Sequence, residues 1–213
     1  MEFLKSLIDF ILHIDKHLFQ IVTDYNNWTY LILAIIVFCE TGLVVTPLLP
    51  GDSLLFAAGA IAAKGLLNLP LLIVILFVAA FTGDNLNYFI GKFLPPKVIE
   101  KDYRFMKKNY LTQTHEFYEK HGGKTIIIAR FMPIIRTFAP FVAGVGTMNY
   151  SKFISFSLLG NALWILICSL AGYWFGNFPI IQNNFSLVIL AIIAISMTPP
   201  LIAFIRVKLQ KTT

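Results

Sequence analysis

Long apolar stretches alternate in this chain with short sites where proline, glycine and charge come together. The sharpest of these sites lies within Glu40–Gly59, which reads ETGLVVTPLLPGDSLLFAAG. Proline removes a backbone donor and clashes with the preceding turn, and Pro50-Gly51 is a turn signal. We therefore predict a broken, re-entrant helical hairpin over residues 31–63. Its helix breaks are placed at Pro47, Pro50 and Gly51.

A second stretch of the same design is Thr125–Gly146, TIIIARFMPIIRTFAPFVAGVG. It is apolar, interrupted by prolines and closed by glycines, but its charges are arginines in place of carboxylates. These features predict a second hairpin over residues 125–148. Its helix breaks are placed at Pro133, Pro140 and Gly144.

The two hairpins have similar surroundings. Aligning Pro47 with Pro133 brings Ala58-Gly59 near Ala143-Gly144. Each hairpin also precedes an apolar helix with a polar patch, which holds Gly83-Asp84 in the first case and Gly160-Asn161 in the second. An odd number of crossings between such units makes them inverted repeats, a pattern of transporters with broken helices. We predict two opposed hairpins, the first opening outward and the second inward.

The remaining elements follow from the spacing of apolar residues. A length of about 20 apolar residues spans a hydrocarbon core of roughly 30 Å, whereas amphipathic segments lie at the membrane surface. The predicted elements are an amphipathic helix over 2–22, spanning helices over 69–91, 153–175 and 186–205, and an interfacial helix over 97–121. Together with the hairpins they make a single membrane domain over 1–213.

Composition supports this assignment, because 57% of the 213 residues are hydrophobic and only 13% are charged. Soluble domains carry about 25% charged residues. The apolar runs also lack the alternation of an outer-membrane barrel. The fold class is therefore an all-α polytopic membrane protein.

The net charge of +6 is unevenly distributed. Lys92–Lys124 holds eight Lys and Arg residues against four Asp and Glu residues, and the tail after Phe204 is basic, whereas Asn177–Phe185 carries no charge. By the positive-inside rule, the basic segment and the C-terminus are cytoplasmic. Basic residues beside membrane segments suit anionic lipid headgroups, so no nucleic-acid partner is predicted.

Two acids of the first hairpin, Glu40 and Asp52, lie in a stretch that is apolar enough for membrane depth. Acids at that depth are costly and usually mark a substrate or ion pathway. Because a low dielectric favours the protonated form of a carboxyl group, we predict that Glu40 and Asp52 carry protons.

Arg130 and Arg136 of the second hairpin carry permanent charges on guanidinium groups, whose forked donors suit phosphate oxygens. We predict that they bind the phosphate of an anionic substrate. The alternative is that both form structural ion pairs with Glu40 and Asp52. The two interpretations are compatible, since an acid that takes up a proton releases its arginine for substrate.

Asp84 is a possible additional site residue, together with Asn87 and Asn161. Asp84 could lie near cytoplasmic headgroups beside Lys92, or face the same cavity as the hairpin acids. No nucleophile motif, phosphate-cradling glycine loop or metal-ligand cluster occurs in the sequence. We therefore predict no enzyme activity, no metal and no cofactor.

Three segments together resemble the DedA family of bacterial inner-membrane proteins, within the wider VTT-domain (SNARE-associated Golgi protein) superfamily. They read FCETGLVVTPLLPGDSLLFAAGA, GDNLNYFIG and FYEKHGGKTIIIARFMPIIRTFAPFVAG. The resemblance covers nearly the whole chain, and its paired proline, glycine and charge motifs are specific. It implies a multi-pass protein of the bacterial inner membrane, in which the family's essential acids match Glu40 and Asp52 and its essential arginines match Arg130 and Arg136.

The resemblance further implies a transporter that maintains the membrane and cell envelope. Members of the family are implicated in returning undecaprenyl phosphate across the membrane and in resistance that depends on the proton motive force. The expected function is thus a proton-coupled flippase of an anionic lipid, a polyprenyl phosphate or a phospholipid. A proton-coupled antiporter of small cations or drugs is the alternative, and a non-transporting scaffold is a third hypothesis. A homo-oligomer is compatible with the sequence.

Overall fold

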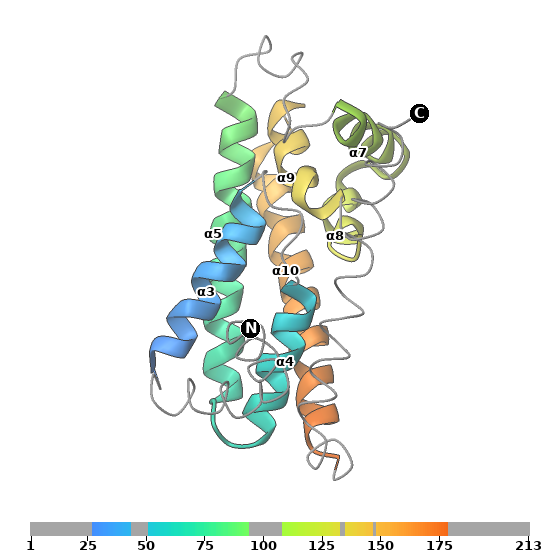
Figure 1. Cartoon of the computed structure of the whole chain (residues 1–213). Helices are drawn as coiled ribbons and strands as arrows, with labels where there is room; N and C mark the ends of the chain where they lie inside the picture. The colour runs from blue at the N-terminus through green and yellow to red at the C-terminus, as the bar shows by residue number, and fades with distance from the viewer. Residues whose placement is uncertain (1–26, 44–50, 94–107, 133–134, 147, 179–213) are drawn as a thin grey trace, which may run out of the picture. The chain divides into compact units, whose positions relative to one another are not determined.

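The computed structural model describes residues 27–43, 51–93, 108–132, 135–146 and 148–178 (Figure 1). Over these residues the chain forms helices and no strands, which confirms the all-α class there. The helices are α3 (Asn27–Gly42), α4 (Gly51–Ala63), α5 (Leu69–Phe93), α7 (Lys108–His121), α8 (Thr125–Ala129), α9 (Ile135–Val145) and α10 (Tyr150–Gly176), with a 3₁₀ turn at Gly122–Lys124 between α7 and α8.

These bounds agree closely with the two long helices predicted over 69–91 and 153–175. The predicted helices over 2–22 and 186–205 lie outside the described residues, as do Pro47, Pro50 and Pro133. The re-entrant course of the two hairpins and their inverted repeat stay predictions.

Asparagine residues define where the two long helices begin. Asn68 accepts a hydrogen bond from the backbone N–H of Leu71 at 3.0 Å, and Asn149 accepts one from the N–H of Ser151 at 2.9 Å. Such caps satisfy backbone donors that have no partner inside a helix. The sequence therefore fixes the first turn of α5 and of α10 locally.

The chain divides into two compact units. The described part of the first unit consists of residues 27–31, 51–72 and 168–178. Within it α4 lies directly against the end of α10, because a Cβ atom on Gly59 would overlap the carbonyl oxygen of Ser169, and one on Gly172 would overlap that of Phe56. Small residues at such positions let helix backbones approach closely.

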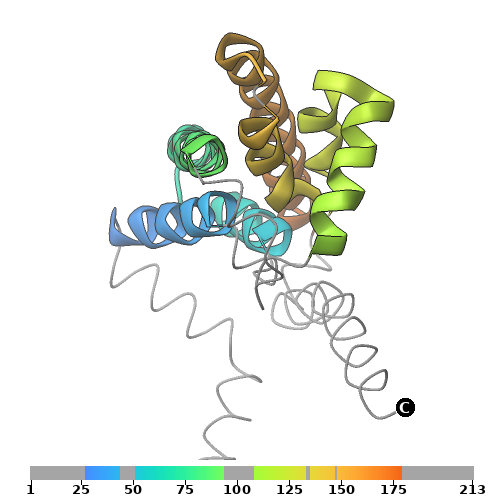
Figure 2. The ribbon, with the colours of Figure 1, turned by 90° about the horizontal axis from the view of Figure 1, so that it is seen from above.

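The second unit contains residues 32–49 and 73–167 and holds most of the candidate site residues. Here α5 and α9 make a close approach, since Gly91 faces the carbonyl of Phe141 and Gly144 faces that of Tyr88. α7 packs against α8 and α9, and the three helices lie side by side in both views (Figures 1 and 2). Fully buried aromatic rings fill the space between, among them Phe138 and Phe141.

Two of the described helices, α5 and α10, are long and apolar enough to cross a membrane, each with a mean hydropathy of 2.0. Large apolar side chains on both are exposed, for example Val74 at 58% and Ile167 at 53%. A soluble protein rarely exposes apolar side chains in such numbers, whereas lipid tails accommodate them. Five polar residues near the middle of these helices are instead buried, namely Asp84 and Asn87 of α5 and Ser157, Asn161 and Ser169 of α10.

Pro140 does not break a helix, in contrast to the sequence prediction. α9 runs through it from Ile135 to Val145. A proline in a helix interior leaves one carbonyl without its usual donor, but tight packing against neighbouring helices can hold such a turn. Pro140 is buried among buried neighbours, and the change of direction falls earlier, between the end of α8 at Ala129 and the start of α9.

The contact between α5 and α9 gives a first testable prediction. Gly144→Ala should lower the unfolding free energy in detergent by about 1–3 kcal/mol, because the added methyl group overlaps the Tyr88 carbonyl. Gly146→Ala is the matched control, since its Cβ would meet only the Val142 carbonyl at 3.1 Å. Thermal unfolding of both variants measures the difference, and equal stability would show that the helices are not in close contact here.

Candidate functional site

Asp84 is the centre of a buried polar cluster in the second unit. It lies on the inward face of α5, where Leu76, Ala80, Asn87 and Tyr88 are also buried. Residues three or four positions apart share one face of a helix. The helical period therefore places the Asp84 carboxylate on the buried face of α5. The sequence had left open whether Asp84 lies beside Lys92 near the headgroups or faces the interior, and its burial favours the interior.

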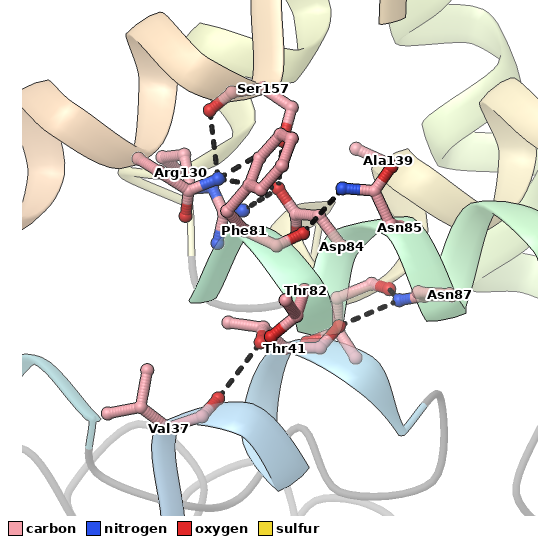
Figure 3. A network of polar contacts seen from close by, with 12 residues as sticks. Val37, Thr41, Phe81, Thr82, Asp84, Asn85, Asn87, Arg130, Ala139 and Ser157 are labelled. Atoms are coloured by element: carbon pink, nitrogen blue, oxygen red, sulfur yellow. Dashed lines mark hydrogen bonds and ion pairs between the residues drawn. The ribbon is translucent and has the colours of Figure 1, made fainter. Parts of the chain in front are cut away.

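Three side chains donate to the same carboxylate oxygen of Asp84 (Figure 3). The Arg130 guanidinium forms a buried ion pair with Oδ2, the Ser157 hydroxyl donates at 2.7 Å, and the Asn161 amide donates at 2.8 Å. Arg130 follows α8 directly, whereas Ser157 and Asn161 lie one turn apart on α10. A buried charge needs partners of this kind, because desolvation costs several kcal/mol per ion.

A second buried ion pair joins Arg136 of α9 to Glu40 of α3, with 2.5 Å between Nη2 and Oε1. Arg136 is 10% exposed and Glu40 is 3% exposed. The two arginines stand on either side of the junction between α8 and α9. The interruption of the helix at this junction thus lets both guanidinium groups reach inward from one short segment.

Trp164 of α10 lies between the two ion pairs. The guanidinium carbon of Arg130 is 5.5 Å from the centre of its ring, and that of Arg136 is 5.7 Å from it. Cations within about 6 Å of an indole face are attracted to it. One buried ring, 1% exposed, therefore holds both arginines in the same neighbourhood.

Asn87 connects three helices of this cluster. Its amino group donates to the carbonyl of Thr41 in α3 at 3.0 Å and to that of Thr137 in α9 at 2.8 Å. Because only the amino group can donate to carbonyls, the orientation of the amide is fixed. α3, α5 and α9 are thereby held together beside the Glu40–Arg136 pair.

Three buried oxygens of the cluster have no hydrogen-bond partner among the described residues. They are Oδ1 of Asp84, of Asn87 and of Asn161. Buried acceptors nearly always have a donor or a cation nearby. The described protein groups thus provide fewer donors than the acceptors here require.

Tyr118 of α7 closes the cluster from the side of the polar helix. Its hydroxyl donates to the Ala139 carbonyl at 2.9 Å, and its ring packs against buried residues of α9. Burial raises the pKa of the Tyr118 phenol, and the charge of Asp84 raises it further. The phenol consequently stays neutral and keeps its hydrogen bond well into the alkaline range.

Six of the predicted site residues meet in this cluster. Glu40, Asp84, Asn87, Arg130, Arg136 and Asn161 all lie in it. Asp52 belongs to the first unit, where it is exposed in the first turn of α4 directly after Gly51. Arg130 pairs with Asp84, which differs from the alternative in which both arginines pair with the two hairpin acids.

Sequence reasoning missed Ser157, Trp164 and Tyr118. The helical period offered a signal for two of them, since Ser157 precedes Asn161 by four residues and Trp164 follows it by three, on one face of α10. Tyr118 lies within the predicted interfacial helix over 97–121, and nothing in the sequence indicates that this helix meets α9.

The matches to known proteins agree with this architecture. The VTT domain family matches residues 49–174 of the chain. Protein DedA of Escherichia coli K12 is 51% identical over 98% of this chain and 96% of its own length. An uncharacterised membrane protein of Mycobacterium leprae is 44% identical over 79% and 76%, and the inner membrane protein YqjA of Escherichia coli K12 is 34% identical over 71% and 69%. No solved structure matches the chain.

The fold and the matches define a helical membrane protein with a VTT domain, whose polar groups are gathered on buried helix faces. Within that class, the chain belongs to the DedA family. The family resemblance seen in the sequence is confirmed.

The Asp84–Arg130 pair gives a second prediction. Asp84→Ala and Arg130→Ala should each lower the unfolding free energy by about 3–5 kcal/mol, because each leaves an uncompensated buried charge. The double variant should cost clearly less than the two single changes together, and Ser157→Ala about 1 kcal/mol, the value of one hydrogen bond. Unfolding in detergent measures all four, and strictly additive costs would contradict the pair.

The third prediction concerns pH and Tyr118. Below about pH 10 the phenol is neutral in both the folded and unfolded states, so it adds no pH dependence. Above that value the unfolded phenol ionises first, and the folded state loses stability as the pH rises. Tyr118→Phe should cost about 1 kcal/mol at neutral pH but decline less steeply than wild type between about pH 10 and 11. Parallel stability curves for the two proteins would argue against a buried, neutral Tyr118.

Proposed function

We propose that this protein is an inner-membrane flippase of an anionic lipid, with a polyprenyl phosphate such as undecaprenyl phosphate as the substrate. Arg130 and Arg136 bind the phosphate in this proposal. The observation that carries it is the pair of buried guanidinium groups beside the Trp164 ring, each of which forms an ion pair with a carboxylate. The DedA family resemblance supports the class of substrate.

The charges of the cluster suit a ligand that exchanges with carboxylates. Two arginines and two acids, Asp84 and Glu40, make the ionised cluster neutral. A phosphate offers the same kind of oxygen acceptors as a carboxylate, and guanidinium groups bind both in a forked geometry. A phosphate therefore competes with Asp84 and Glu40 for the arginines.

Proton coupling follows from the same competition. Uptake of a proton removes the charge of Glu40 and so releases Arg136 for substrate, and loss of the proton restores the pair. We extend this role to Asp84 and Arg130, since that pair has the same form. Asp52 remains a proposed proton carrier from the first hairpin. We also propose that the basic segment and the C-terminus are cytoplasmic, which the charge distribution favours.

Contacts within the second unit support an inverted repeat. Gly83 of α5 lies against Thr41 in α3, as Gly160 of α10 lies against Ile127 in α8. The following polar residues of the two repeats, Asp84 and Asn161, contact each other directly at 2.8 Å. In a protein built from inverted repeats, corresponding residues are expected to meet in this way near the pseudo-two-fold axis that relates the repeats. Transporters built from inverted repeats bind substrate near such an axis.

A second candidate function, cation antiport, is favoured by one observation. The three buried oxygens without a donor, on Asp84, Asn87 and Asn161, are ligands of the kind that small cations prefer. In an antiporter of small cations or drugs these oxygens would contribute to the substrate site, and the arginines would be structural. The two functions differ in what happens when an arginine is replaced.

The fourth prediction tests the flippase in proteoliposomes. Wild type should move a labelled polyprenyl phosphate across the bilayer at a rate that responds to a pH gradient. Arg136→Ala should bind the lipid about tenfold more weakly or worse, because at least one charged hydrogen bond is lost, and Arg136→Lys should retain part of the binding. Equal lipid binding by all three proteins would remove Arg136 from the site.

The same vesicles distinguish the antiporter. If wild type is folded and moves no lipid phosphate, but exchanges a small cation for protons, the antiport function replaces the flippase. Glu40→Gln should then abolish cation exchange, since the amide cannot carry the proton.

A further inference from the structure

A cavity of about 1010 Å³ lies in the second unit, between α7, the end of α9 and the first turns of α10. None of the charged residues of the buried cluster lines it. Its walls fall into two kinds of surface. The apolar part is formed by Val142, Met148 and Phe156, and the polar part by side chains of α7 and the start of α10.

The polar wall carries a cation on its α10 side. Lys152 lies beside the hydroxyl-bearing residues Ser151 and Ser155 on the first turns of α10, and all three are exposed. The α7 side of the wall holds His115 and Glu119, which are 3.7 Å apart. The positive potential therefore lies on the α10 side, where the N-terminal end of the helix adds to the charge of Lys152.

The apolar wall depends on a glycine. A Cβ atom on Gly123 would overlap the ring of Phe156, so only glycine lets this ring lie against the backbone of the 3₁₀ turn. The ring is half-buried and forms one side of the cavity. An apolar surface of this size next to one lysine and two serine hydroxyl groups suits an amphiphile better than a free anion.

The level at which the cavity lies relative to the membrane fits a lipid-binding site. α10 is long and apolar enough to cross a membrane, so its first turns lie where a span meets the headgroup layer. α7 has only 14 residues and is polar, as expected of an element at that level.

We infer that this cavity is a binding site for one membrane phospholipid, whose phosphate contacts Lys152 with Ser151 and Ser155 and whose upper acyl chain lies against Val142, Met148 and Phe156. The site is separate from the arginine cluster, and the inference does not rest on lipid transport.

Quenching of a tryptophan introduced into the cavity wall by brominated lipids tests this site. Phe156→Trp places an indole in the cavity wall, and the emission of Trp28, Trp164 and Trp174 is subtracted with the wild-type protein. Full-length protein is reconstituted with phosphatidylglycerol carrying brominated acyl chains, or with diacylglycerol carrying the same chains but no phosphate. The added indole should reach half-quenching at about a tenfold lower mole fraction of the phosphatidylglycerol, as expected for a charged hydrogen bond.

Two lysine variants locate the phosphate contact. Lys152→Ala in the reporter protein should remove the preference for phosphatidylglycerol, whereas Lys120→Ala, an exposed lysine of α7 outside the cavity wall, should leave it unchanged. Equal quenching by both lipids, or an equal effect of both lysine variants, would overturn the site. Displacement of the lipid by millimolar inorganic phosphate alone would overturn the assignment to a phospholipid in favour of a free anion. Met148→Trp serves as reporter if the first variant does not fold.

Discussion

The structure of the second unit depends on the cost of burying charge in a membrane protein. Arg130 is 3% exposed and its partner Asp84 is 1% exposed, and each charge offsets the cost of burying the other. The requirement extends beyond the pair, because Ser157 and Asn161 also donate to the same oxygen of Asp84. The carboxylate of Asp84 on α5 thereby links the α8–α9 junction and α10 through hydrogen bonds to a single oxygen atom. Any rearrangement that separates these helices must first provide another partner for a guanidinium group.

Close packing of the helix backbones makes this arrangement possible. Charged side chains reach each other only if the helices that carry them come near, and glycines permit this at Gly83 against α3, at Gly91 and Gly144 between α5 and α9, and at Gly160 against α8. Three of these glycines, Gly83, Gly91 and Gly160, lie within a few residues of Asp84, Asn87 and Asn161 on the same helices. Polar and small residues therefore occupy the same buried faces for related reasons: the small ones bring the helices together, and the polar ones hold them in register.

Much of this could be predicted from the sequence, because the signals are local. Apolar runs of the right length gave α5 and α10, the cost of acids at membrane depth singled out Glu40 and Asp52 and left Asp84 open, and guanidinium chemistry singled out Arg130 and Arg136. The pairing could not be predicted, because Asp84 and Arg130 are 46 positions apart and Glu40 and Arg136 are 96 apart. Their meeting depends on how several helices are rotated about their own axes. Pro140 shows the converse: a local rule predicted a break, and tertiary packing maintained the helix.

The asymmetry of the two ion pairs bears on how a ligand could enter the cluster. Asp84 is bound by three donors on one oxygen, and it is paired with the less exposed of the two arginines, since Arg130 is 3% exposed and Arg136, the partner of Glu40, is 10% exposed. Displacing Asp84 from Arg130 leaves it two hydrogen bonds, so its carboxylate retains partners while the guanidinium is shared. Both arginines also keep their contact with the face of Trp164, which does not depend on either acid. The ring can thus hold the two cations near each other while their anionic partners exchange, which is the property that a binding site for a phosphate requires.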